Sequence, residues 1–255
     1  MKGLWRGFLT LVSLLLVWQL VVTLGDLPPY ILPSPWAVML ALWHHGESLL
    51  HHAGITALEI VLGMLLGTLL GCGSALALSY SRRARRWLLP VLIASQAIPV
   101  FAIAPLLVLW LGYGMGSKIA MSMLILYFPV TANFYDGLRH TQRGWLDLAR
   151  VMLPKPRRWA VLWHIAIPAA LPALAAGLRS AAAVGLIGAV LGEWVGSSAG
   201  LGYLMLHANS RMQVDLMFAA LFVLAALAVG LYFLVDTGLK RLLPWHPTIP
   251  ETEID

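Results

Sequence analysis

Long apolar runs separated by short charged stretches extend from one end of the chain to the other. A run of about 20 apolar residues is the length that a helix needs to cross the hydrocarbon core of a bilayer. The pattern predicts six membrane-spanning helices, over residues 4–24, 56–80, 88–111, 119–135, 169–195 and 216–235. We therefore expect an all-α polytopic protein with one transmembrane domain over 1–255, its core at about 50–240 and a tail at 240–255.

Small residues follow one face of two of these predicted helices. Gly63, Gly67 and Gly71 are spaced four apart, and alanine and glycine dominate the run from 173 to 192. Such rows let helix backbones approach closely in a membrane. They predict tight packing and carry no chemistry of their own.

The connection after the first predicted span has the pattern of a helix start. Ser34 is suited to the N-cap and Pro35 to the first turn. Large apolar side chains then recur at helical spacing, at Trp36, Met39, Leu40 and Trp43. The segment predicts an amphipathic helix that lies on the outer membrane surface or against the bundle.

The composition and the low charge content are typical of an integral membrane protein. Hydrophobic residues make up 60% of it and charged residues 11%, with a mean hydropathy of +0.82, whereas soluble domains carry about 25% charge. The basic clusters follow the second, fourth and sixth spans, at Arg82, Arg83, Arg85, Arg86, Arg139, Arg143, Arg150, Lys155, Arg157, Arg158, Lys240 and Arg241. The opposite side carries only Lys118 and Arg211.

The positive-inside rule converts this asymmetry into an orientation. The basic loops and both termini are expected to be cytoplasmic, in a multi-pass protein of the bacterial inner membrane. The length of the first run favours a retained helix over a cleaved signal. The pI near 9.8 then reflects topology, and we expect no nucleic-acid partner.

Motifs for catalysis are not evident. The sequence contains no H-E-x-x-H, G-x-S-x-G or paired-carboxylate pattern, and the glycines at 112–116 lack the order of a phosphate loop. The same-face histidine pairs of the first loop are seven residues apart, which does not suit two ligands of one metal ion. We expect no enzyme activity, no metal site and no cofactor bound by this chain.

The ionisable residues nearest the spans give little support for proton-coupled transport. Each lies close to a predicted helix end, at Glu59, Asp136, Glu193, Asp215 and Asp236. A coupled-ion transporter usually places such a group deep in the bilayer, so a secondary transporter is the less favoured alternative.

Two prolines mark a candidate translocation path. Pro99 and Pro105 remove backbone donors within the third predicted span, so that helix is expected to kink or open. Irregular backbone in a membrane is tolerated only against protein or a watery cavity. The candidate path residues are Gln96, Pro99, Pro105, Asn133 and Glu193.

The cytoplasmic loop over 137–167 is about 30 residues long and basic. Residues 145–152 predict a short helix within it, ended by Pro154 and Pro156. Loops of this length in a compact bundle are usually functional. The form indicates a helix that projects from the membrane as a docking surface.

Here the sequence resembles the permease subunits of bacterial ABC importers, in the branch for nitrate, sulfonate, taurine and thiamine precursors. The loop matches at Asp147, Leu148 and Ala149, then at 167–172 and 177–179. Further matches, in the expected order, are 33–35, Ile98, Pro99, Ala104, Pro105, Phe128, Pro129 and 200–202. The chain departs from the family at Leu153, where a glycine is usual, and Asp147 to Pro168 is two residues longer than usual.

The resemblance implies the type I importer fold and a division of labour among partners. An ABC ATPase dimer would hold ATP and Mg²⁺ and seat the loop through Trp145, Asp147, Leu148, Ala149 and Arg150. A periplasmic substrate-binding protein would deliver the solute, and a second copy of this chain would complete the path. This chain would itself break no bond.

Within the family, the segments at 193–209 and 215–218 resemble the branch that imports hydroxymethylpyrimidine-type thiamine precursors. A sulfonate or taurine permease of the same family is the alternative substrate assignment. A membrane enzyme and a secondary transporter remain as alternatives outside the family.

Overall fold

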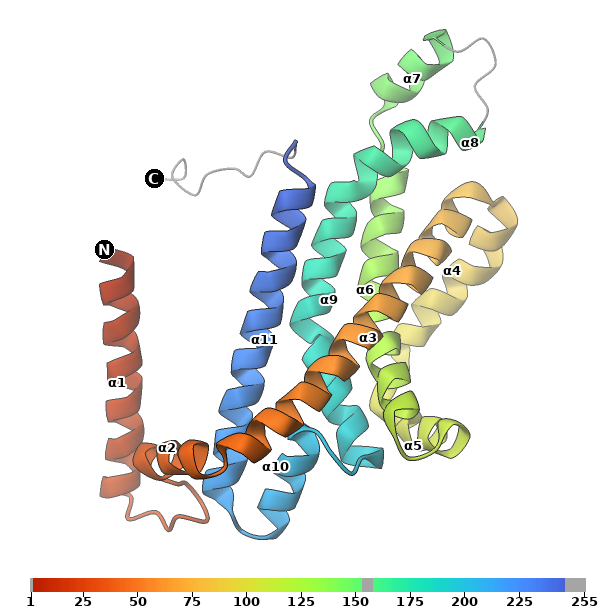
Figure 1. Ribbon diagram of the computed structural model, residues 1–255. Helices are drawn as coiled ribbons and strands as arrows, with labels where there is room; N and C mark the ends of the chain where they lie inside the picture. Colours follow the sequence, from red (N-terminus) through yellow and green to blue (C-terminus); the bar gives the residue numbers. More distant parts are fainter. Residues whose placement is uncertain (1, 153–157, 246–255) are drawn as a thin grey trace.

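A computed structural model describes residues 2–152 and 158–245, and every regular element in these ranges is helical (Figure 1). The helices are α1 Lys2–Leu24, α2 Pro35–His44, α3 Gly46–Tyr80, α4 Arg82–Ala97, α5 Val100–Leu111, α6 Met115–Arg139, α7 Arg143–Met152, α8 Arg158–Val161, α9 Ile167–Gly196, α10 Leu201–Ser210 and α11 Val214–Leu242. A π-helical turn, Leu162–Ala166, joins α8 to α9. The predicted all-α membrane fold is confirmed.

Five helical stretches are long and apolar enough to cross a membrane. These are Trp5–Leu24, Gly46–Tyr80, Met115–Arg139, Trp159–Gly196 and Val214–Leu242. Together α4 and α5 make a sixth if they are counted as one broken span. The count of six agrees with the sequence, although α3 begins ten residues before the predicted start at 56.

The third predicted span, 88–111, forms two helices, and the predicted kink or opening is confirmed at Pro99. Helix α4 ends at Ala97, α5 begins at Val100, and the two are bent by 103°. Pro99 lacks the amide hydrogen that would continue α4, and it forces Ile98 into extended backbone, with φ −87° and ψ 116°. Pro105, by contrast, lies inside α5 without breaking it.

Helix α6 packs between α3 and α9 at the centre of the bundle, and small residues make this possible. A Cβ atom added at Gly67 of α3 would lie 3.1 Å from the carbonyl oxygen of Met123 in α6. One added at Gly177 of α9 would lie 2.9 Å from that of Pro129. The glycine rows therefore set the distance between the three central helices, as the sequence predicted.

Helix α1 stands at the edge of the molecule, apart from the central helices (Figure 1). Its large apolar side chains are exposed, among them Leu14, Leu16 and Leu20. A surface of this kind is stable against lipid or another transmembrane helix.

Helix α2 begins as predicted, because the Ser34 side chain accepts a hydrogen bond from Ala37 N at 3.2 Å. Its buried side chains are Val38 and Ala41, whereas Trp36 and Trp43 are exposed. The smaller residues thus pack on the bundle, and the tryptophans face outward.

The two ends of the molecule carry different elements (Figure 1). Helices α2 and α10 lie at one end. Helix α7, the start of α1 and the end of α11 lie toward the other. The basic clusters therefore lie at the same end of the molecule as the start of α1 and the end of α11.

Candidate functional site

Helix α7 projects beyond the ends of α6 and α9, at the extremity of the molecule (Figure 1). Trp145 and Leu148 are more than half exposed, and Asp147 is exposed as well. Ala149 faces inward and is buried. A short helix with large apolar side chains in water is typical of a surface that a partner covers.

The position of α7 links it to the centre of the bundle. It follows α6 directly, and the chain then enters α8, which continues through the π-helical turn into α9. The predicted turn at Leu153 to Pro156 lies outside the described residues, as does the side chain of Arg150. In the order of the chain, α7 therefore lies between two helices that are long enough to cross a membrane.

A cavity of about 410 Å³ lies beside the break between α4 and α5. Gln96 and Ser95 of α4, Ile103 of α5 and Tyr127 of α6 are among the residues that line it. The lining is largely apolar, with few polar groups, which is typical of sites for small organic molecules.

The other candidate path residues occupy different places. Pro99 is at the break itself, and Pro105 lies in α5. Asn133 of α6 donates a hydrogen bond to Pro129 O of its own helix at 2.8 Å. Of the five candidates, Gln96 lines this cavity, whereas Asn133 and Glu193 are not among its lining residues.

Three charged side chains that lie far apart in the sequence meet inside the bundle. They are Glu59 on α3, Lys118 in the first turn of α6 and Glu193 near the end of α9. Their exposed fractions are 0%, 4% and 1%. Lys118 Nζ forms an ion pair with Glu59 and donates to Ser197 Oγ at 3.0 Å. We call these three residues the buried ion cluster.

Glu193 also fixes the start of α10. Its carboxylate accepts hydrogen bonds from Thr56 Oγ1 at 2.6 Å and from the backbone N–H groups of Gly202 and Tyr203. The first N–H groups of a helix have no partner within it, and the helix dipole favours a negative charge there. The carboxylate therefore joins α10 to both α9 and α3.

The turn before α10 allows this close approach because it contains no side chain. Gly200 has φ +120°, a conformation that other residues rarely adopt. A Cβ atom at this position would collide with the Glu193 carboxylate. Gly200 N donates to His52 Nδ1 at 3.0 Å, so the turn is also bound to α3.

The sequence analysis did not find this cluster. The prediction that Glu59 lies near a helix end is wrong, because α3 begins at Gly46 and carries Glu59 well inside the helix. One signal was available: Lys118 is one of only two basic residues on its side of the membrane, and it follows directly on a glycine-rich turn. Its partners lie 59 and 75 residues away along the chain, so spacing alone could not identify them.

Among the residues that the structure describes, no group of three histidine, cysteine or acidic side chains is placed to hold a metal ion. The described helices combine membrane spans, a projecting short helix and a cavity at a broken span. This combination defines the class of polytopic transport subunits.

The chain belongs to the family of binding-protein-dependent transport system inner membrane components, whose sequence pattern matches residues 60–245. It is 61% identical over 230 residues to a probable ABC transporter permease protein of Haemophilus influenzae, covering 90% of this chain and 93% of that one. The predicted family is confirmed, and the chain is the permease subunit of an ABC importer in a membrane.

Several other relatives are named for a substrate, among them permeases for formylaminopyrimidine and riboflavin. The chain is 35% identical to the formylaminopyrimidine transport permease protein ThiX of Halalkalibacterium halodurans, over 91% of this chain and 92% of the other. It is 38% identical to the riboflavin transport system permease protein RibX of Chloroflexus aurantiacus, over 93% and 88%.

Proposed function

We propose that this permease passes a hydroxymethylpyrimidine-type thiamine precursor from a periplasmic binding protein to the cytoplasm, driven by ATP on a separate ATPase dimer. The ATP-driven part of the proposal is carried by α7, which projects with exposed Trp145 and Leu148 from a chain of the importer family. The substrate part is supported by the 35% identity to the formylaminopyrimidine permease. We propose further that all of 1–255 acts as one membrane domain and binds no cofactor. ATP and Mg²⁺ belong to the ATPase.

The ATPase would act on this chain through α7. In the proposal, Trp145, Asp147, Leu148, Ala149 and Arg150 seat in the ATPase, and closure of the ATPase dimer displaces them. Because α7 lies between α6 and α8–α9 in the chain, the displacement reaches both central helices. The buried ion cluster ties the far ends of α6 and α9 to α3, so the three helices would move as one body.

The break at Pro99 would separate this body from α5. Helices α4 and α5 flank the cavity that contains Gln96, and their 103° bend provides a position at which they can turn relative to α6. We propose that Gln96, Pro99, Pro105 and Asn133 border the path, and that Glu193 holds its outer end in shape. A second copy of the chain would supply the opposite wall.

The basic ends of the helices support a cytoplasmic position for both termini. In this orientation α7 faces the compartment that contains ATP, and α10 faces the binding protein. A reporter fused after the tail should be active only in the cytoplasm, and periplasmic activity would contradict the orientation.

Docking of α7 can be tested by co-purification of the ATPase with the tagged permease. Trp145→Ala combined with Leu148→Ala removes two exposed apolar side chains, and we expect at least about a ten-fold loss of bound ATPase. Asp147→Lys should act in the same direction. Trp36→Ala is the matched control, because Trp36 is an exposed tryptophan at the opposite end of the molecule. Parental ATPase recovery with the α7 variants, at parental permease yield, would contradict the docking role.

The substrate can be tested with the binding protein encoded beside this gene. Calorimetric titration should compare hydroxymethylpyrimidine, formylaminopyrimidine, riboflavin and taurine. We expect a pyrimidine to bind at least about ten-fold more tightly than the others, a difference of about 1.4 kcal/mol. Tightest binding of riboflavin or taurine would overturn the substrate assignment and leave the permease role intact.

A further inference from the structure

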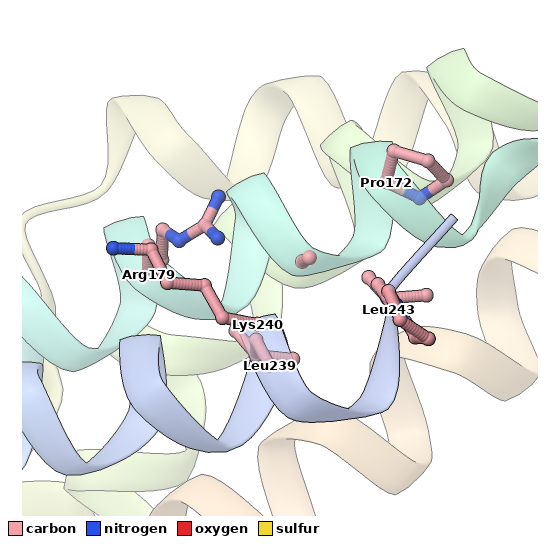
Figure 2. Close-up of a pocket in the computed structure, with 7 residues that line it drawn as sticks. Pro172, Arg179, Leu239, Lys240 and Leu243 are labelled. Atoms are coloured by element: carbon pink, nitrogen blue, oxygen red, sulfur yellow. The ribbon is translucent and has the colours of Figure 1, made fainter. Parts of the chain in front are cut away.

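A second charged site lies between α9 and α11, at the end of the bundle where α11 terminates. A cavity of about 330 Å³ opens there. Figure 2 shows the residues that line it. Its lining includes two cationic side chains, Arg179 of α9 and Lys240 of α11. The remaining wall is mostly apolar, with Pro172, Leu239, Leu243 and Pro244.

The two cations share one carboxylate, Asp236 of α11. Arg179 Nε donates to Asp236 Oδ1 at 2.7 Å, and Lys240 Nζ lies 2.7 Å from Asp236 Oδ2. The carboxylate thus holds both cations beside the cavity, and the three groups together carry one net positive charge. We call Arg179, Asp236 and Lys240 the rim triad.

The rim triad has capacity for a further anion. A guanidinium group has about four N–H donors besides Nε–H, and an ammonium group has about three in all. The side chains of Arg179 and Lys240 are 33% and 55% exposed, so neither is sealed by the protein. Arg241 follows Lys240 and adds to the positive potential at this end of α11.

The depth of the site matches the surface of a bilayer. Lys240 lies in the last turn of a membrane-spanning helix, and the exposed Trp245 follows shortly after it. Tryptophan and lysine at this point of a span are typical of the headgroup region. The apolar residues of the cavity wall come from both α9 and α11, and acyl chains would lie against them.

We propose that the rim triad and its cavity bind the phosphate group of an anionic phospholipid of the cytoplasmic leaflet. Arginine and lysine both bind phosphate through charge-assisted hydrogen bonds, and basic pockets between transmembrane helices on this side suit anionic headgroups. A free phosphate ion would use the same donors, but the apolar wall favours a ligand with acyl chains. The leaflet rests on the proposed orientation, whereas binding itself does not depend on the transport function.

The test is a titration of the delipidated, full-length protein in detergent, followed by native mass spectrometry. Dioleoylphosphatidylglycerol and dioleoylphosphatidylcholine share their acyl chains and differ in charge. We expect at least about five-fold tighter binding of phosphatidylglycerol at one site, the effect of about one favourable lysine near an anionic surface. Equal binding of the two lipids would overturn the proposal.

Two variants assign the binding to this cavity. Lys240→Gln should lower the affinity for phosphatidylglycerol about five-fold, and it leaves the Arg179–Asp236 pair intact to hold the helices together. Arg241→Gln removes the same charge one residue away, outside the cavity lining, and should have a smaller effect. Equal effects of the two variants would show a diffuse surface attraction and contradict the site.

Inorganic phosphate separates the two sources of the anion. We expect millimolar phosphate to leave the bound phosphatidylglycerol in place. Displacement of the bound lipid by phosphate would overturn the lipid assignment in favour of a soluble anion.

Discussion

The buried ion cluster and the rim triad each combine acidic and basic side chains, but they differ in their exposure to solvent. Glu59, Lys118 and Glu193 are at most 4% exposed, and hydroxyl or backbone groups also bind Lys118 and Glu193. In the rim triad, Lys240 is 55% exposed and opens onto a cavity. The comparison indicates that charges sealed in this bundle fix helix positions, whereas charges at its edge remain available to a ligand.

The two sites should also differ in their contribution to stability, because one ion pair is buried and the other is exposed to solvent. Removing one partner of a buried ion pair leaves the other charge without compensation and costs about 3–5 kcal/mol. An exposed pair contributes about 0–1 kcal/mol, because water replaces the lost partner. Substitutions in the two sites should therefore separate clearly in their effect on stability.

The largest effect is expected for Lys118→Met, which leaves the buried carboxylate of Glu59 without its cation. We expect the free energy of unfolding in detergent to fall by about 3–5 kcal/mol. Denaturant titration of the purified variant measures it. Arg211→Met, which removes an exposed base at the same end, is the control. A change for Lys118→Met as small as that for Arg211→Met would show that the buried ion cluster does not stabilise the fold.

Gly200→Ala tests the contact between the cluster and α10. The added Cβ would meet the Glu193 carboxylate in a backbone conformation unsuited to alanine. We expect a loss of about 2 kcal/mol. Gly230→Ala is the matched control, because it lies within α11 and its Cβ would meet no atom within 4 Å. If Gly200→Ala is as harmless as Gly230→Ala, the turn before α10 does not depend on Glu193.

The smallest effect is expected for Lys240→Met in the rim triad. The chemistry of the substitution equals that of Lys118→Met, but the free energy of unfolding should change by no more than about 1 kcal/mol. The same denaturant titration applies. A loss as large as that of Lys118→Met would make the rim triad a structural joint and weaken its assignment as a ligand site.

The sequence was most informative where a feature depends on neighbouring residues. Ser34 and Pro35 predicted the start of α2, and residues 145–152 predicted α7, because caps and helical periodicity act over one or two turns. The family was recognised on Asp147, Leu148 and Ala149 together with the proline and glycine motifs, and the family pattern matches residues 60–245.

The sequence was least informative where distant segments meet. Pro99 predicted an irregularity within the span 88–111, but the sequence did not predict the 103° angle between the two helices. The buried ion cluster joins α3, α6 and α9, so no local spacing reveals it. The sequence placed Lys118 outside the spans, because an unpaired charge inside a membrane is energetically unfavourable. Its partner Glu59 could not be identified from the sequence.

The most direct test of the transport account is uptake into proteoliposomes that contain the permease and the ATPase, with the binding protein outside. We expect accumulation of labelled hydroxymethylpyrimidine that requires both ATP inside the vesicles and the binding protein, and that the α7 variant Trp145→Ala with Leu148→Ala abolishes. Uptake that persists without ATP and collapses with the ion gradient would contradict the account.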